Sequence, residues 1–228
     1  MKLRRVGMAA GAIALVSAMA LTGCTPSDDS GNTGGDSAAI ITANSSEPQN
    51  PLIPTNTNEV GGGKILDSIF AGLVYYDGKG APHNDAAESI TTDDNITFTV
   101  KIKPDLKFTN GDPVDAESFV KAWKYGALAS NAQLSSYFFE DIEGFSYDED
   151  TDLTGLNVVD DLTFTIKLTS ALADFPLRLG YSAFFPLPKS AWDDLDAFGE
   201  NPIGNGPYML AGADAWKHNE KIDLVVNH

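Results

Sequence analysis

Residues 94–101 read DNITFTVK, and residues 161–167 read DLTFTIK. Both segments alternate apolar and polar side chains and are rich in β-branched and aromatic residues, which is typical of strands with one buried face. We therefore predict two amphipathic strands. Two neighbouring strands of one sheet would look alike in this way without any internal duplication.

The segment between these two strands predicts a helix from residue 115 to residue 130. Residues 110–112 (Asn-Gly-Asp) indicate a turn, Asp115 is a suitable N-cap, and Glu117 places an acidic side chain in the first turn. The apolar stripe expected on this helix consists of Phe119, Val120, Trp123 and Ala127.

Flanking segments add further elements of both kinds. Before the first strand, periodicity and turn residues predict a buried strand at residues 40–44, a loop to residue 58, a helix at 59–73 and a strand at 73–76. After the second strand, they predict a short helix at 189–198 and strands at 207–210 and 221–226. The fold class is therefore α/β, with mixed α+β character and several antiparallel strands, and the chain from residue 39 suffices for one domain or one large lobe.

The first 23 residues have the features of a bacterial export signal. Lys2, Arg4 and Arg5 precede an apolar run at residues 6–20, which is shorter than the roughly 20 apolar residues of a spanning helix. Residues 21–24 read Leu-Thr-Gly-Cys and resemble a lipobox. We predict a lipoprotein signal peptide at 1–23 and lipidation of Cys24; an uncleaved N-terminal anchor is the alternative.

Composition limits the classes of partner and of covalent bonding. Residues 25–38 contain no large apolar side chain, so residues 24–38 are predicted to be a flexible tether. Cys24 is the only cysteine, which excludes an internal disulfide. The net charge of −17 disfavours nucleic acid and anionic lipid as partners, because both attract Lys and Arg.

Catalytic and metal-binding motifs are poorly supported. The sequence has no Gly-x-Ser-x-Gly and no His-Glu-x-x-His, and the glycines at 61–63 lack the spacing of a phosphate-binding loop. Asp148, Asp150 and Asp152 match the first ligands of a calcium loop, but Leu153 and Val159 stand where Gly and Glu are required. We predict no enzyme activity, no metal and no cofactor.

Aromatic side chains offer two interpretations. Trp123 is predicted to lie in the core because it belongs to the helical stripe, whereas Trp192 and Trp216 stay undecided between packing and ligand stacking. Residues 137–139 (Tyr-Phe-Phe) lie in a predicted loop, where aromatic residues often line a cleft. Packing against the lobe is the preferred interpretation for Phe138 and Phe139.

From residue 39 onward, the chain resembles the family 5 extracellular solute-binding proteins, the oligopeptide- and dipeptide-binding receptors. The blocks that carry the resemblance are FAGLVYYD at 70–77, AES at 87–89, TFTVKI at 97–102, KFTNGDPVDAESF at 107–119 and NPIGNGPY at 201–208. Asn205 stands where the family usually has Thr, and Ala86 where a larger apolar residue is common.

The resemblance implies a lobe like that of type II periplasmic binding proteins, with a mixed sheet, and it covers less than half of a usual member, so we expect an N-terminal fragment with the second lobe largely missing. It also implies a monomeric lipoprotein, held on the extracytoplasmic side of the cell membrane, that captures peptides and delivers them to the permease subunits of an ABC importer. By resemblance, Ser46 and Glu47 contact the peptide backbone, Tyr137 lines the cleft, and Asn58 is a weaker candidate.

Two alternatives stay open. The same fold serves receptors for other solutes, such as nickel chelates, haem or sugars, because fold does not determine the ligand. A secreted hydrolase or an adhesin is a more distant alternative, since the hydrolase motifs are missing.

Overall fold

The computed structural model describes residues 40–228. The predicted signal peptide, the lipidation residue Cys24 and the tether lie outside the described residues and stay predictions. The account below concerns the compact unit Ala43–His228. Among the described residues, no helix has both the length and the apolar character needed to cross a membrane.

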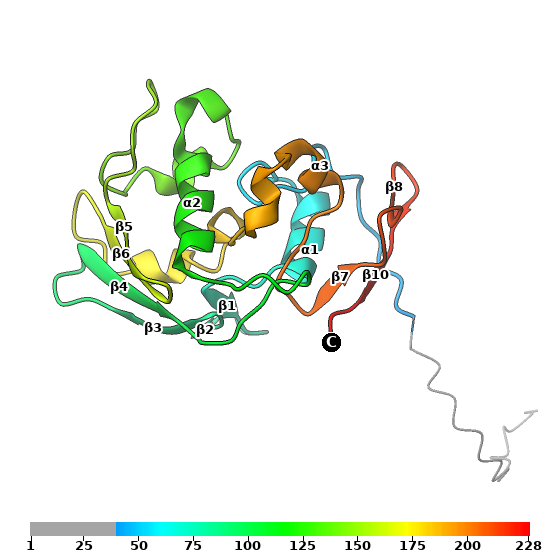
Figure 1. Ribbon diagram of the computed structural model, residues 1–228, viewed down its shortest axis with the longest axis horizontal. Helices are drawn as coiled ribbons and strands as arrows, with labels where there is room; N and C mark the ends of the chain where they lie inside the picture. The colour runs from blue at the N-terminus through cyan, green and yellow to red at the C-terminus, as the bar shows by residue number, and fades with distance from the viewer. Residues whose placement is uncertain (1–39) are drawn as a thin grey trace, which may run out of the picture. The chain divides into compact units, whose positions relative to one another are not determined.

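A four-stranded antiparallel sheet contains the two segments with alternating side chains. Its strands lie in the order β3 (Ala87–Thr91), β4 (Thr97–Ile102), β6 (Thr163–Lys167) and β5 (Leu156–Asp160) (Figure 1). The two predicted strands are neighbours, because β4 pairs with β6. In this register Phe98 is opposite Ile166 and Val100 is opposite Phe164, so the buried side chains of both strands share one face.

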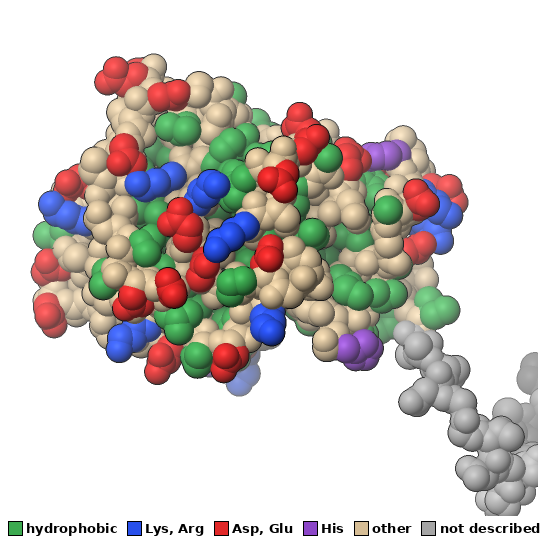
Figure 2. Space-filling model, viewed as in Figure 1, with side chains coloured by type: hydrophobic (Ala, Val, Ile, Leu, Met, Phe, Trp, Pro, Cys, Tyr) green, Lys and Arg blue, Asp and Glu red, His purple; other side chains and the backbone are tan. Residues whose placement is uncertain are grey.

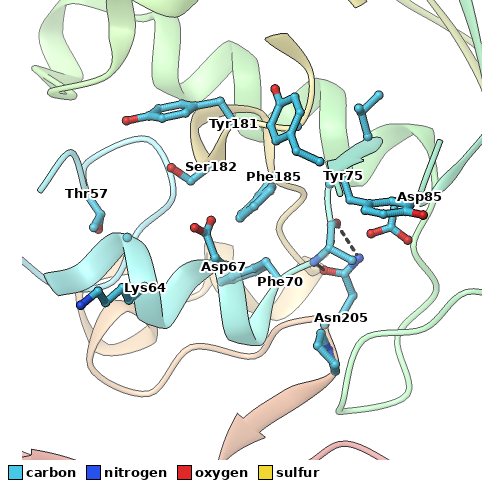
Figure 3. A pocket seen from close by; sticks show the side chains of 18 of the residues that line it. Thr57, Lys64, Asp67, Phe70, Tyr75, Asp85, Tyr181, Ser182, Phe185 and Asn205 are labelled. Carbon is cyan, nitrogen blue, oxygen red and sulfur yellow. Dashed lines mark hydrogen bonds between the residues drawn. The ribbon is translucent and has the colours of Figure 1, made fainter. Parts of the chain in front are cut away.

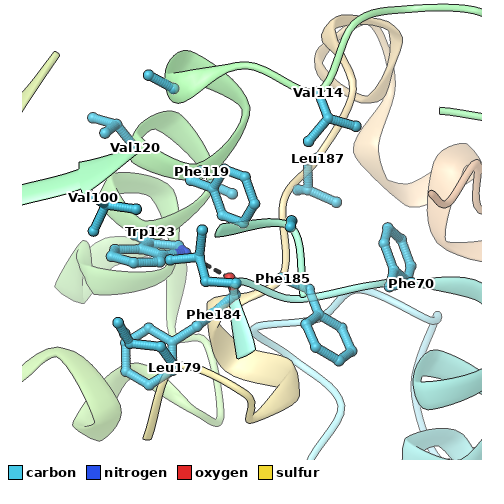
Figure 4. Packing of buried hydrophobic residues seen from close by; sticks show 14 of the residues in the cluster. Phe70, Val100, Val114, Phe119, Val120, Trp123, Leu179, Phe184, Phe185 and Leu187 are labelled. Atoms are coloured by element: carbon cyan, nitrogen blue, oxygen red, sulfur yellow. Dashed lines mark hydrogen bonds between the residues drawn. The ribbon is translucent and has the colours of Figure 1, made fainter. Parts of the chain in front are cut away.

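Helix α2 (Ala116–Ala127) packs on that buried face (Figures 1 and 4). Asp115 caps it in a reciprocal capping box with Ser118, as the sequence predicts. The ring of Phe119 stacks on Phe164 with a centroid distance of 6.0 Å, and Trp123 is fully buried, which confirms its place in the core. The indole N–H of Trp123 donates to the carbonyl of Phe184 at 3.0 Å, so the polar atom of this core residue is satisfied.

Apart from α1, the other elements of the unit are short. The helices are α1 (Val60–Ile69) and α3 (Leu195–Glu200), and the 3-10 turns are η1 (Ala129–Asn131), η2 (Ser136–Phe139), η3 (Phe175–Arg178), η4 (Ser182–Phe184) and η5 (Lys189–Trp192). The strands form three antiparallel pairs, β1 (Val74–Tyr76) with β2 (Pro82–Asn84), β7 (Tyr208–Leu210) with β10 (Leu224–Val226), and β8 (Trp216–Lys217) with β9 (Lys221–Ile222). The mixture of helices and strands confirms the predicted α/β class. All strand pairs in the described residues are antiparallel, so the sheet of this part is not the mixed sheet that the resemblance implied.

Both long helices end earlier than predicted, because tertiary contacts capture their last backbone groups. Helix α1 ends at Ile69 instead of residue 73, since the amide of Gly206 donates to the carbonyl of Ile69 at 2.8 Å. Helix α2 ends at Ala127 instead of residue 130. There the Asp150 carboxylate accepts the amide of Ser130 at 2.8 Å, and Leu128 is extended.

Three predicted elements differ more strongly. Residues 40–44 form no strand, and Ile40 and Ile41 are 93% and 86% exposed, because no strand of the described residues pairs with them. The predicted helix at 189–198 is divided into η5 and α3, since the Asp194 carboxylate accepts the amide of Ala197 and begins a new helix. The predicted strand at 221–226 is divided at Asp223 into β9 and β10. The amide of Asp223 donates to the carbonyl of Ala215, and its carbonyl accepts the amide of Ala211.

Candidate functional site

A hollow of about 1050 Å³ lies along α1 (Figure 3). We call it the hollow throughout. It is lined by residues 57–60, 63, 64, 67, 70–72, 74–76, 85, 180–182, 185 and 205–207. Its volume is at the upper end of the range for small-ligand pockets, which is roughly 300–1,000 Å³.

One face of α1 borders the hollow and the opposite face borders the core. Val60, Gly63, Lys64 and Asp67 recur at the spacing of neighbouring helical turns and line the hollow. Leu66 and Ile69, on the other face, are fully buried. The helix is therefore amphipathic with its polar face turned to the hollow.

The glycines at the start of α1 have different surroundings. A Cβ on Gly62 would lie 2.5 Å from the methyl group of Thr57 and 2.5 Å from the Glu59 carboxylate, whereas a Cβ on Gly63 would meet nothing within 4 Å. The Glu59 carboxylate caps the helix by accepting the amide of Gly62 at 2.9 Å. The amide of Gly62 at this helix start is therefore satisfied within the chain.

The segment around Asn205 fixes the other end of α1. The Asn205 side chain accepts from the amide of Ala71 and donates to its carbonyl, each at 3.0 Å (Figure 3). A Cβ on Gly204 would lie only 1.8 Å from the carbonyl oxygen of Ile69, so the backbones approach too closely for a side chain. Asn205, which stands where the family usually has Thr, therefore joins the chain beside the hollow to Ala71 through two hydrogen bonds.

Aromatic rings cover the part of the hollow nearest the turn η4. Tyr181 stacks on Phe138 with a centroid distance of 4.3 Å, and Phe138 lies 4.6 Å from Tyr137. Phe185 stacks on Phe70 at 6.0 Å. Tyr181 is 38% exposed and burial raises the pKa of its hydroxyl.

Two acidic side chains in the hollow have raised pKa values. Asp85, beside Tyr75 at one end, is half-buried, and burial raises the pKa of its carboxyl although the charge of Lys103 opposes this. Asp67 points into the hollow farther along α1, beside Ser182 (Figure 3). Its carboxyl is exposed to the hollow, but the surrounding protein desolvates it and raises its pKa.

The structure places the four predicted ligand residues differently. Asn58 lines the hollow, and Tyr137, 47% exposed, packs against Phe138, which in turn stacks on the lining residue Tyr181. Ser46 and Glu47 do not line the hollow. Ser46 lies directly against the start of α1, where its carbonyl would be 2.4 Å from a Cβ on Gly61.

Glu47 is held by a network that the sequence did not reveal. Its carboxylate accepts the indole N–H of Trp216 at 3.0 Å and lies 2.9 Å from Nδ1 of His218, whose Nε2 lies 3.0 Å from Glu200. Hydrogen bonding to Glu47 raises the pKa of His218, and Glu200 adds to this effect. Desolvation opposes ionisation of Glu47, but bonds from the Asn219 backbone, His218 and Trp216 hold its pKa below the ordinary value.

The two undecided tryptophans both have intramolecular partners. Trp216 is buried and bonds Glu47, as above. Trp192 packs against Tyr125 at a centroid distance of 5.6 Å, and the ammonium of Lys121 lies 4.6 Å from its ring centroid. Neither tryptophan lines the hollow.

Two of the three aspartates that resemble a calcium loop also have protein partners. Asp150 accepts the amide of Ser130, and Asp152 pairs with Lys124 at 2.7 Å. Within residues 40–228, no three acidic, histidine or cysteine side chains are grouped so as to hold a metal ion. Acidic side chains are instead distributed over the visible face of the molecule (Figure 2).

A family model described as bacterial extracellular solute-binding proteins, family 5 middle, matches residues 81–228, more than half of this chain. The periplasmic oligopeptide-binding protein OppA of Haemophilus influenzae is 32% identical over 201 residues, covering 82% of this chain and 36% of that protein. The dipeptide-binding protein DppE of Bacillus subtilis is 29% identical over 227 residues, covering 93% of this chain and 41% of that protein.

Solved structures share the fold. The crystal structure of H. influenzae OppA in complex with the peptide RPPGFSPFR matches with a TM-score of 0.73 and 30% identity, covering 79% of this chain and 36% of that chain. This likeness confirms the lobe architecture that the sequence resemblance implied. The chain spans about two fifths or less of the length of these relatives.

Proposed function

The chain belongs to the bacterial extracellular solute-binding proteins of family 5, and from this premise we propose that it captures peptides outside the cytoplasm and delivers them to an ABC importer. The observation that carries the proposal is the structural match to OppA holding a nonapeptide. The hollow supports it, because a groove with aromatic walls and several polar side chains can hold a peptide backbone and side chains of varied type.

The proposed mechanism is closure of two lobes on the ligand. A ligand that contacts both lobes stabilises the closed state selectively, and this differential affinity shifts the population towards it. In this proposal the present chain supplies one face of the cleft, with Asn58 and Tyr137 on or beside the hollow and Ser46 and Glu47 near the helix start. That these four residues contact the peptide is part of the proposal.

The network around Glu47 refines one of these assignments. Its carboxylate already serves Trp216 and His218, so a peptide would meet the backbone of residues 46–47 more readily than the Glu47 side chain. The side chain then acts as a positioning group for that segment. This agrees with the expectation that the stretch contacts the peptide backbone.

The proposal includes a membrane anchor. Cleavage before Cys24 and lipidation of its thiol would tether a monomer to the extracytoplasmic side of the cell membrane, with permease subunits as partners. A protein with this role performs no catalysis, and the family is a solute-binding one.

Native mass spectrometry of the protein purified from its own cells, without a denaturing wash, tests these points together. We expect the mass of a lipid on a chain beginning at Cys24, and a distribution of peptide adducts. A lipidated protein with no peptide adduct, which also fails to bind added tri- to pentapeptides in calorimetry, would contradict peptide capture while leaving the anchor intact.

A further inference from the structure

Asp67 is an acidic side chain without a partner inside the hollow. Figure 3 shows its carboxylate directed into the space beside Ser182 and Phe185. Among the described residues, no hydrogen bond or ion pair engages it, and burial is the cause acting on its pKa. Lys64, one helical turn earlier, points away and donates to the carbonyl of Asn44 at 3.2 Å.

The other two carboxylates of the hollow each have a donor or a positive charge acting on them. Glu59 accepts the amide of Gly62 with both oxygens at 2.9 Å, so its charge is used for capping. The charge of Lys103 acts on Asp85 and offsets part of the effect of burial, whereas no charge of the described residues does so for Asp67. Asp67 is therefore the carboxylate of this site whose charge a ligand can complement.

The surroundings of Asp67 suit a cation on an apolar stem. The stacked rings of Phe70 and Phe185 form one wall, and Tyr181 presents a partly exposed aromatic ring nearby. Lysine and arginine bury their aliphatic stems along apolar surfaces while their charged ends bind carboxylates or aromatic faces. An acidic or purely aliphatic side chain would leave the Asp67 charge uncompensated.

We propose that the part of the hollow around Asp67 is a subsite for a lysine or arginine side chain of the bound peptide. This inference rests on the proposed function and deepens it, because it makes the protein a receptor that favours basic peptides. The raised pKa of the Asp67 carboxyl supports the proposal, since a carboxylate desolvated without a counter-charge gains from a cationic partner.

Calorimetry on the full protein tests the subsite. The probes are alanine tetrapeptides that carry lysine at each position in turn, matched with peptides that carry norleucine, which has a similar stem and no charge. For one position we expect lysine to bind about tenfold more tightly than norleucine. Asp67→Asn should reduce this ratio to near one without weakening the norleucine peptide.

Two variants control for charge and folding. Asp93→Asn makes the same change at an exposed residue that does not line the hollow, and should keep the ratio. Asp67→Glu retains the charge and should keep most of the preference, so it gives an answer even if Asp67→Asn unfolds.

The outcomes separate the two proposals. Peptide binding with no preference for lysine, or a preference that Asp67→Asn leaves intact, overturns the subsite alone. A charge dependence that follows acetylation of the peptide's amino terminus rather than the lysine also overturns it. Failure of every peptide to bind overturns the proposed function and this inference together.

Discussion

Helices α2 and α1 are both amphipathic, but they differ in what surrounds them. Between α2 and the sheet, Phe119, Trp123 and Phe164 contact one another and are fully buried; Figure 4 shows Phe119 and Trp123 in this core. Along α1, only one face packs, and the other carries Gly63 and Asp67 towards a hollow. The closed region provides the stability of the unit, and the open region provides a surface that a ligand can complete.

We expect the largest effect from a substitution that removes the side chain at the centre of the closed region. Trp123→Ala deletes a fully buried indole that contacts Phe119, Phe139, Phe164 and Phe184, so it should lower the free energy of unfolding by about 3–5 kcal/mol. Urea denaturation followed by circular dichroism measures this. Trp192→Ala, on a partly buried ring, should cost clearly less, and equal losses would contradict the distinction between the two tryptophans.

Alanine substitutions of the adjacent glycines Gly62 and Gly63 test where the closed region ends along α1. Gly62→Ala should destabilise by about 1–3 kcal/mol, because its Cβ would meet Thr57 and the capping carboxylate. Gly63→Ala should stabilise by about 0.5–1 kcal/mol, since its Cβ enters open space and alanine favours the helix. The two melting temperatures should move in opposite directions, and a shared direction would place the boundary elsewhere.

The clamp of Asn205 joins the two regions. Asn205→Ala removes two hydrogen bonds to Ala71 and should lower the free energy of unfolding by about 1–2 kcal/mol. Denaturant titration measures the change. Asn201→Ala, at an exposed position nearby, is the matched control and should be close to neutral.

The smallest expected effect is electrostatic and depends on pH. The pKa of His218 is raised above 6.5 in the folded protein, so its contribution is complete below pH 6.5 and is lost as the pH rises through the raised value. The pKa of Glu47 is lowered from 4.5, so its contribution is present above pH 4.5 and is lost as the pH falls through the lowered value. The network should therefore stabilise most between pH 4.5 and 6.5.

Thermal melts across pH check this window. The difference in melting temperature between the unmodified protein and His218→Ala should be greatest there and should shrink towards pH 9. A difference that does not vary with pH would show that His218 acts by packing against Trp216, at a centroid distance of 4.4 Å, and not by charge.

The site was only partly predictable, and particular residues show why. Asn58 and Tyr137 came from the family resemblance, and the structure places one in the hollow and the other beside it. Asp67 was missed, because it occupies an ordinary polar position of an amphipathic helix. Its surroundings in the hollow include Ser182 and Phe185, which lie more than 100 residues later in the chain, so no local pattern shows that it lacks a partner.

By itself, the sequence determined the features that depend on neighbours in the chain. The alternation of residues 97–102 and 163–167 specified two strands with one buried face, and Asp115 specified the start of α2, because period and capping are local properties. Only the tertiary structure decided where α1 ends, that Glu47 serves Trp216 and His218, and that Asp67 faces a hollow without a counter-charge. These features arise from groups distant in sequence, whose meeting depends on how the whole core packs.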